Sequence, residues 1–262
     1  MHKFGFIGTG VMAGAMLKSA LQAGFLESGD ILVYDKNPLA AQNFGATAAQ
    51  DAKQVAEQCE IVQLGVKPQV LPTLLEEISA QIQDKLVVSI AAGVTLAQLA
   101  PFAPRVVRLM PNINAAAGKS CTTFCATEQV TAQEIDFIQN YCMCFGTAIA
   151  LEEMHFSASL AIAASGPAFV YLFIDELARA GVTAGLPRAK ALELATQCVL
   201  GSATMVQESN THPCQLADQV CSPGGTTIAG VNALRKHGFS HAVSQAVLAA
   251  AARDKELGIL NM

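Results

Sequence analysis

Apolar and polar positions alternate along the first half of the chain in two kinds of block. Short apolar runs, which are typical of buried strands, are separated by longer stretches in which apolar residues recur with helical spacing. The strand-like runs cover residues 3–7, 30–34, 60–66, 86–90, 105–110, 120–126 and 148–151. The helix-like stretches cover residues 11–23, 38–44, 51–58 and 72–83. This alternation favours parallel βαβ units and predicts a doubly wound sheet covered by helices on both faces.

The pattern changes near residue 152, after which helical spacing dominates and no strand-like run appears. Helices are expected over residues 156–180, 187–207, 226–237 and 240–257. We therefore expect an α/β domain over residues 1–152, followed by an all-α domain over residues 153–262.

Residues 156–174 carry no charge, and this run of nineteen approaches the roughly 20 residues that span a bilayer. The run contains serines and a Gly-Pro pair, and acidic pairs flank it where a spanning helix normally has Lys or Arg. A helix buried between subunits explains these features better than a membrane span. We expect no membrane association.

The strongest local motif is Gly8-Thr9-Gly10-Val11-Met12-Ala13, directly after the first expected strand. In this G-x-G-x-x-A pattern Gly8 allows the tight turn, Gly10 lets a pyrophosphate approach the backbone, and Ala13 lets the helix pack on the strand. Amides at the helix start then face the phosphates. An ordinary glycine turn is the alternative. The order of strand, turn, helix and second strand favours a Rossmann-type dinucleotide site.

Asp35 ends the second expected strand, where an acidic residue usually binds the adenosine ribose and favours NAD. Lys36 and Asn37 follow at once and are able to hold a 2′-phosphate instead. A third interpretation is a capped turn that leads into the next helix. NADH and NADPH both remain open at this point.

Three further loops follow strands at the same expected sheet edge, where ligands of such folds bind. Each alone is typical of a plain strand-to-loop turn. Together, with their small residues and one free amide side chain, they suit the passage of a nicotinamide. The candidate residues are Val66, Lys67, Pro68, Ala91, Ala92, Gly93 and Asn112.

In the helical half, one segment differs from its surroundings: Ser222-Pro223-Gly224-Gly225-Thr226-Thr227. Its glycines free backbone N–H groups just before a helix that is expected to begin near Thr226. Such a helix start is a site for a carboxylate. The alternative is an uneventful turn in which Ser222 or Thr226 caps the helix.

Composition narrows the class of protein. Across 262 residues, 52% hydrophobic and 14% charged residues exclude an intrinsically disordered chain and point to subunit contacts. The net charge of −5, with no basic run, argues against nucleic-acid binding. The eight cysteines form no CxxC pair and have no His pair at metal spacing, so we expect no metal. We interpret them as small buried hydrophobes in a reducing compartment, which places the protein in the cytoplasm.

No Ser-His-Asp pattern and no phosphate-binding P-loop occur in the sequence. The expected chemistry therefore needs no strong side-chain acid or base. Hydride transfer to an already protonated C=N bond fits, because the cofactor performs the difficult step and the protein orients the reactants.

Six segments together make the chain resemble the pyrroline-5-carboxylate reductases over essentially its whole length: residues 8–13, 66–68, 88–94, 108–112, 164–169 and 222–228. The last is the family's signature. The resemblance implies reduction of L-1-pyrroline-5-carboxylate to L-proline with NADPH or NADH, the last step of proline biosynthesis. It also implies a Rossmann domain followed by a helical dimerisation domain, hence a homodimer, in some members the unit of a higher-order ring.

The resemblance also assigns site residues. The backbone of Gly224, Gly225 and Thr226 is expected to hold the substrate carboxylate, and Thr227 to hydrogen-bond the ring nitrogen as the catalytic residue. Ser222 shapes this loop, and Glu153 is expected to face the ring. Because the helical domain is shared across a dimer, each site is expected to take residues 222–227 from the other chain.

Two features depart from the family's pattern. Residues 110–114 replace a frequent Asn-Thr-Pro ending, and Asp35 stands where many NADPH-preferring members carry Ser or Thr. The cofactor preference usual in the family nevertheless slightly favours NADPH over NADH. The rival functions are another two-domain NAD(P)-dependent dehydrogenase or imine reductase, and a non-catalytic dinucleotide sensor. A β-hydroxyacid dehydrogenase needs a lysine within residues 156–174, which contain none, and a sensor has no reason to keep residues 222–227.

Overall fold

The computed structural model describes residues 2–260. The chain divides into two compact units, one formed by Met1–Ser165 with Ala249–Met262 and the other by Gly166–Leu248. The expected division between domains at residues 152 and 153 stays a prediction.

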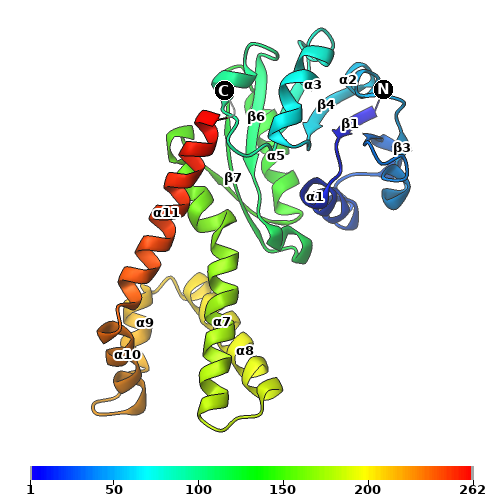
Figure 1. Cartoon of the computed structure of the whole chain (residues 1–262). Helices are drawn as coiled ribbons and strands as arrows, with labels where there is room; N and C mark the ends of the chain where they lie inside the picture. Colours follow the sequence, from blue (N-terminus) through cyan, green and yellow to red (C-terminus); the bar gives the residue numbers. More distant parts are fainter. Residues whose placement is uncertain (1, 261–262) are drawn as a thin grey trace. The chain divides into compact units, whose positions relative to one another are not determined.

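Within the described residues, the first unit is built on an eight-stranded sheet with the order β3-β2-β1-β4-β5-β6-β7-β8 (Figure 1). The strands are β1 (His2–Ile7), β2 (Ile31–Tyr34), β3 (Thr47–Ala48), β4 (Cys59–Leu64), β5 (Leu86–Ser89), β6 (Arg105–Met110), β7 (Ser120–Ala126) and β8 (Gly146–Ala150). The strand order reverses at β1, which lies between β2 and β4, and ligands of doubly wound sheets bind at this point.

Neighbouring strands are parallel, as the alternating pattern predicts, with one exception. β6 and β7 pair antiparallel, with Arg108 opposite Cys125. The connection between them covers only residues 111–119 and contains a 3₁₀ turn, Ile113–Ala117, instead of a crossover helix. A parallel pair needs a crossover of a dozen or more residues, so the expectation of parallel units alone is wrong at this pair.

Helices cover both faces of the sheet, which confirms the layered arrangement. On one face Phe4 and Phe6 of β1 pack with Tyr141, and on the other Ile7 packs with Val55 and Leu74. The helices of this unit are α1 (Val11–Gln22), α2 (Ala52–Gln58), α3 (Leu71–Ile78), α4 (Leu96–Leu99), α5 (Ala132–Met143) and α6 (Phe156–Ser159). A π-helical turn, Leu160–Ala164, follows α6.

One predicted helix of this unit needs correction, and helices α4 and α5 were not predicted. The stretch 38–44 forms only a 3₁₀ helix, Ala41–Phe44, which Gly45 ends with a φ of +61°. Helix α5 was not expected, although Thr131 and Glu134 form a capping box at its start. The box is a sequence signal that would have located this helix.

The remaining helices are α7 (Gly166–Thr183), α8 (Arg188–Ser209), α9 (Pro213–Gln219), α10 (Thr226–Lys236) and α11 (Phe239–Leu260). The structure shows no strand after β8 within residues 2–260, as the sequence predicts. α7 and α8 lie side by side (Figure 1), where Ala178, Ala191 and Ala195 form a small buried cluster. These small residues allow the two helices to approach closely.

The apolar run at the start of the helical half is largely exposed in the single chain. Only 6% of its most apolar window within Glu153–Thr183 is buried, and Leu172 is 65% exposed. By length and composition this is the one candidate membrane-spanning helix of the described residues, which is weak evidence for a span. A large exposed apolar surface of this kind marks a site of contact with another protein, a membrane or a ligand.

The eight cysteines are free thiols in the structure. Cys59 and Cys142 are buried, as expected for small hydrophobes, and burial raises the pKa of Cys59 to about 12. Cys198 and Cys214 are exposed on the single chain, so the expectation of buried cysteines is wrong for these two.

Candidate functional site

The turn after β1 requires glycine at position 8. Gly8 has a φ of +87°, and its N–H donates to the carbonyl of Tyr34 at 2.8 Å. A Cβ at Gly8 would lie 2.9 Å from the carbonyl carbon of Gly65, and one at Gly65 would lie 2.3 Å from the oxygen of Gly8. The ends of β1 and β4 therefore approach more closely than side chains allow.

The first helix begins at this turn with its N-terminus open. Gly10 is the N-cap of α1, no side chain caps the helix, and a Cβ at Gly10 would meet nothing within 4 Å. Ala13 is buried against the sheet. Uncapped N–H groups beside open space at a helix start fit the pyrophosphate of a dinucleotide.

The Asp35 carboxylate is held by hydrogen bonds from two segments. Its Oδ2 accepts from the Thr9 backbone N–H at 2.7 Å and from the Thr9 hydroxyl at 3.1 Å, and its Oδ1 accepts from the Asn37 N–H at 2.9 Å. Burial raises the pKa of Asp35, but the hydrogen bonds outweigh burial and leave the pKa below its usual value. The side chain is therefore ionised at neutral pH.

Many of the expected cofactor-binding residues line one cavity of about 500 Å³ at the carboxyl edge of the sheet. It brings together Gly8, Gly10, Asp35, Lys36, Val66 and Lys67, together with Thr73 and Glu77. The remaining members of the glycine motif lie beside it: Thr9 and Val11 line an adjacent hollow, Met12 is partly buried, and Ala13 faces the core. Asn37 accepts from Leu39 N–H with its side-chain oxygen, and Pro68 begins a 3₁₀ turn.

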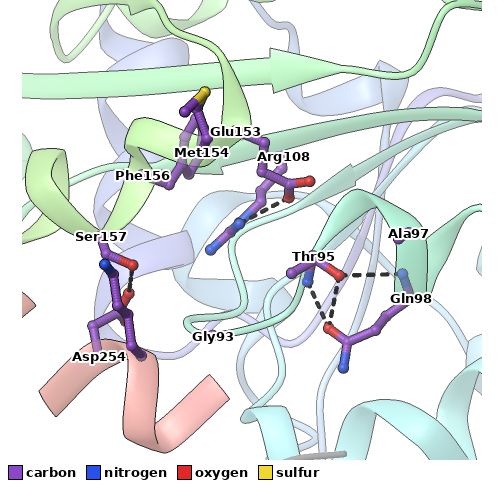
Figure 2. Close-up of a pocket in the computed structure, with 11 residues that line it drawn as sticks. Gly93, Thr95, Ala97, Gln98, Arg108, Glu153, Met154, Phe156, Ser157 and Asp254 are labelled. Carbon is purple, nitrogen blue, oxygen red and sulfur yellow. Dashed lines mark hydrogen bonds and ion pairs between the residues drawn. The ribbon is translucent and has the colours of Figure 1, made fainter. Parts of the chain in front are cut away.

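A second cavity of about 600 Å³ in the same unit is lined by residues after β5, by Arg108 of β6 and by residues 153–157 (Figure 2). Among the expected site residues it contains Gly93 and Glu153. Ala91 is buried and Ala92 is exposed. The lining also includes Arg108 and a hydrogen-bonded pair, Ser157 with Asp254, whose Oγ and Oδ2 lie 2.8 Å apart.

Glu153 is engaged within its own unit. Its Oε1 accepts from Arg108 Nη1 and from the backbone N–H of Leu96, both at 2.8 Å. The guanidinium of Arg108 also lies over the ring of Phe156, 4.6 Å from the ring centroid. Sequence reasoning assigned no role to Arg108, although a charge in the middle of an apolar strand is a usable signal. The contact of Glu153 with substrate stays a prediction.

Asn112 does not present the free amide that was expected. Its Nδ2 donates to the carbonyl of Ala163 at 2.7 Å, and its Oδ1 accepts from the Asn114 N–H at 3.1 Å. The side chain thus joins the end of β6 to the π-helical turn, and it is nearly fully buried. The expectation of a free amide is wrong, and the role of Asn112 in cofactor binding stays a prediction.

Residues 222–227 form a glycine turn that opens α10. Gly225 is the N-cap and no side chain caps the helix, so the alternative in which Ser222 or Thr226 caps it is wrong. Gly224 has a φ of +67°, and a Cβ at Gly225 would lie 2.3 Å from Ser222 Oγ. Gly225 N–H donates to the Ser222 carbonyl and Ala229 N–H to the Gly225 carbonyl, so the N–H groups of Thr226, Thr227 and Ile228 make no bond within the helix. Both threonines are exposed.

Comparison with known proteins connects these features. A family model described as pyrroline-5-carboxylate reductase dimerisation matches residues 153–257, and one described as NADP oxidoreductase, coenzyme F420-dependent, matches residues 3–93. Pyrroline-5-carboxylate reductase of Escherichia coli (strain K12) is 40% identical over 97% of this chain and 98% of its own length. The enzyme of the same name from Pisum sativum is 39% identical over 98% of this chain and 96% of its own.

Solved structures agree. A crystal structure of Plasmodium falciparum pyrroline carboxylate reductase with NADP bound has a TM-score of 0.89 to this chain at 29% identity, and covers 98% of both chains. The fold is thus shared end to end with a protein that binds NADP. By this full-length identity and likeness, the chain belongs to the pyrroline-5-carboxylate reductase family.

Proposed function

We propose that this protein reduces L-1-pyrroline-5-carboxylate to L-proline with NADPH or NADH, as the last step of proline biosynthesis. The observation that carries the proposal is that two helices in one chain of this family begin at a glycine N-cap with no side-chain cap. One follows the Gly8–Gly10 turn and fits a dinucleotide, and the other follows residues 222–225 and fits a carboxylate. A dinucleotide sensor would need only the first.

The second helix start binds and orients the substrate. The N–H groups of Thr226 and Thr227 lie at the positive end of the 11-residue helix α10 and hold the substrate carboxylate. The Thr227 hydroxyl hydrogen-bonds the ring nitrogen. Ser222 supports the turn, because its Oγ occupies the space that a Cβ at Gly225 would take. Glycine is therefore required at 225 for this geometry.

The reaction needs no strong acid or base from the chain. When bound, NAD(P)H supplies the hydride that adds to the carbon of the protonated C=N bond. The π electron pair of that bond moves to nitrogen, which keeps its proton and becomes the amine of proline. The residues at the two helix starts orient the cofactor and the imine toward each other. This orientation lowers the entropic part of the activation free energy.

We propose a homodimer in which each site combines the glycine turn of one chain with residues 222–227 of the other. The exposed apolar side chains of α7 and α8 support this arrangement, as does the dimerisation model that matches residues 153–257. A measurement of the mass of the assembly in solution would distinguish a single dimer from a ring of dimers. Eight free thiols are consistent with a place in the reducing cytoplasm.

Mixed dimers test the proposal. Gly10→Ala and Thr227→Ala chains carry different affinity tags, are produced together, and their heterodimer is purified through both tags. If sites are shared, one of the two sites combines the intact glycine turn of the Thr227→Ala chain with the intact loop of the Gly10→Ala chain. We expect about half of wild-type turnover with pyrroline-5-carboxylate. A heterodimer no more active than either homodimer would contradict shared sites.

A further inference from the structure

The cofactor cavity contains opposite charges where the two nicotinamide cofactors differ. NADPH carries a phosphate on the adenosine ribose where NADH has a hydroxyl, and this end of the cofactor lies beyond the second strand of a Rossmann sheet. In this chain Asp35 and Lys36 follow β2 and both line the cavity. A carboxylate favours the hydroxyl, whereas an ammonium group favours the phosphate.

The structure distinguishes the two residues by how firmly each is held. Asp35 has both carboxylate oxygens fixed, Oδ2 by the two donors of Thr9 and Oδ1 by the Asn37 N–H. These three bonds hold the carboxylate in the lining of the cavity. Lys36 is exposed on a flexible stem, and a lysine is a strongly hydrated point charge that is free to move.

The chemistry of an ionised carboxylate then selects the ligand. It offers about four acceptor sites and no donor, and three are used by Thr9 and Asn37. A ribose hydroxyl is able to donate to the remaining site. A phosphate at that position has no donor to offer when it is fully ionised, and it adds negative charge beside the carboxylate.

The rest of the lining does not offset this repulsion. Its charged residues in the described chain are Asp35, Glu77, Lys36 and Lys67, two of each sign. No arginine is among the described residues of this lining, although an arginine is the usual partner of the 2′-phosphate in NADP sites. The acidic and basic residues of this lining therefore balance in number, whereas a site for the 2′-phosphate of NADP has an excess of positive charge.

We propose that Asp35 makes this enzyme select NADH over NADPH. The inference rests on the proposed function for its biological meaning, and it reverses the slight lean to NADPH that family habit suggests. Asp35 acts as the residue that sets specificity, and Thr9 and Asn37 position its carboxylate.

Binding titrations without imine substrate test the inference. The fluorescence of each reduced cofactor is followed as wild-type protein is added, and we expect NADH to bind at least ~10-fold more tightly than NADPH. Asp35→Ser should move the ratio of the two dissociation constants at least ~10-fold toward NADPH. Asp35→Asn keeps the shape of the side chain and removes its charge, so it should also move the ratio toward NADPH. This variant keeps the test available if Asp35→Ser folds poorly.

Two further variants complete the test. Asp30→Ser removes an exposed carboxylate at the other end of β2 and should leave the ratio unchanged. Lys36→Ala should weaken both cofactors equally, by less than about twofold. Equal or tighter binding of NADPH to the wild type, or a ratio that Lys36→Ala changes and both Asp35 variants do not, would overturn the inference.

The test is separate from the proposed reaction. A protein that prefers NADH and fails to reduce pyrroline-5-carboxylate would refute the proposed substrate and leave the role of Asp35 intact. A protein that reduces this imine and binds NADPH more tightly would do the reverse.

Discussion

Arg108 and Glu153 form an ion pair across 45 residues of sequence, with 2.8 Å between Nη1 and Oε1 (Figure 2). The Arg108 side chain is 5% exposed and that of Glu153 is 28% exposed. The same oxygen of Glu153 accepts from the Leu96 N–H, where α4 begins. The pair therefore joins β6 and the 3₁₀ turn Glu153–His155 to the first residue of α4, which follows the loop that contains Gly93.

Removal of Glu153 should destabilise the first unit. Glu153→Ala leaves a buried arginine without its carboxylate, which costs about 3–5 kcal/mol in fully buried pairs, and we expect about 2 kcal/mol here because Glu153 is partly exposed. Urea unfolding measures this loss. The neighbouring exposed residue gives the control, since Glu152→Ala should change stability by less than about 0.5 kcal/mol. Equal losses in the two variants would refute the structural role of the pair.

The kinetics of Glu153→Gln test whether this residue faces the substrate ring. Glutamine keeps an oxygen that accepts from Arg108 and Leu96, so the loop containing Gly93 should stay in place. If Glu153 acts only through this loop, the KM for pyrroline-5-carboxylate should change less than about twofold. A KM raised ~10-fold, with an altered pH profile of kcat/KM, would instead support the direct contact that the family resemblance implies.

The two glycines of the cofactor turn should respond differently to alanine. Gly10→Ala adds a methyl group that meets no protein atom within 4 Å, so stability should stay within about 0.5 kcal/mol while cofactor affinity falls at least ~10-fold. Gly8→Ala should cost at least about 1–2 kcal/mol, because its φ is +87° and its Cβ would press on Gly65. Thermal unfolding and cofactor titration measure the two effects. Gly29→Ala, also with open space, should change neither.

Thr227 and Thr226 should differ although they are adjacent. Thr227→Ala removes the hydroxyl proposed to bond the ring nitrogen, and a bond to a charged group contributes about 1.5–3 kcal/mol, so kcat/KM should fall ~10–100-fold with cofactor affinity unchanged. Thr226→Ala keeps the backbone N–H and should retain activity within about threefold. Steady-state kinetics of both variants decide the matter. Equal losses would show that the helix start, and not the hydroxyl, carries the effect.

The Asp35 carboxylate should contribute stability in a defined pH range. Its pKa is lower in the folded protein than the unfolded value of about 3.9, so its contribution is present above that pH and is lost as pH falls through the folded value. Asp35→Asn should therefore be less stable than wild type at pH 7, by about 1 kcal/mol because the group is partly exposed. Unfolding curves between pH 7 and about 3 should show the difference shrinking below about pH 4. A difference that is constant across this range would contradict the assignment.

Apolar runs and glycine spacing along the sequence predicted the elements that short stretches of chain form by themselves. The glycine turn at 8–13, its strand and its helix follow from spacing alone, as do most strands of the sheet. The antiparallel pairing of β7 was missed because it depends on the length of the loop before it, and α5 was missed although its capping box lies in the sequence. The bonds of Glu153 with Arg108 and Leu96, and that of Asn112 with Ala163, join residues 45 to 57 positions apart. No local pattern predicts such contacts, because the fold brings these residues together.

Oxidation of NADH and of NADPH, followed separately with pyrroline-5-carboxylate and purified protein, together with identification of the product, tests whether this protein is the proposed reductase. We expect cofactor oxidation to depend on the imine and to yield L-proline in equal amount, with NADH as the better cofactor. Binding of both cofactors with no imine-dependent oxidation of either would contradict the claim.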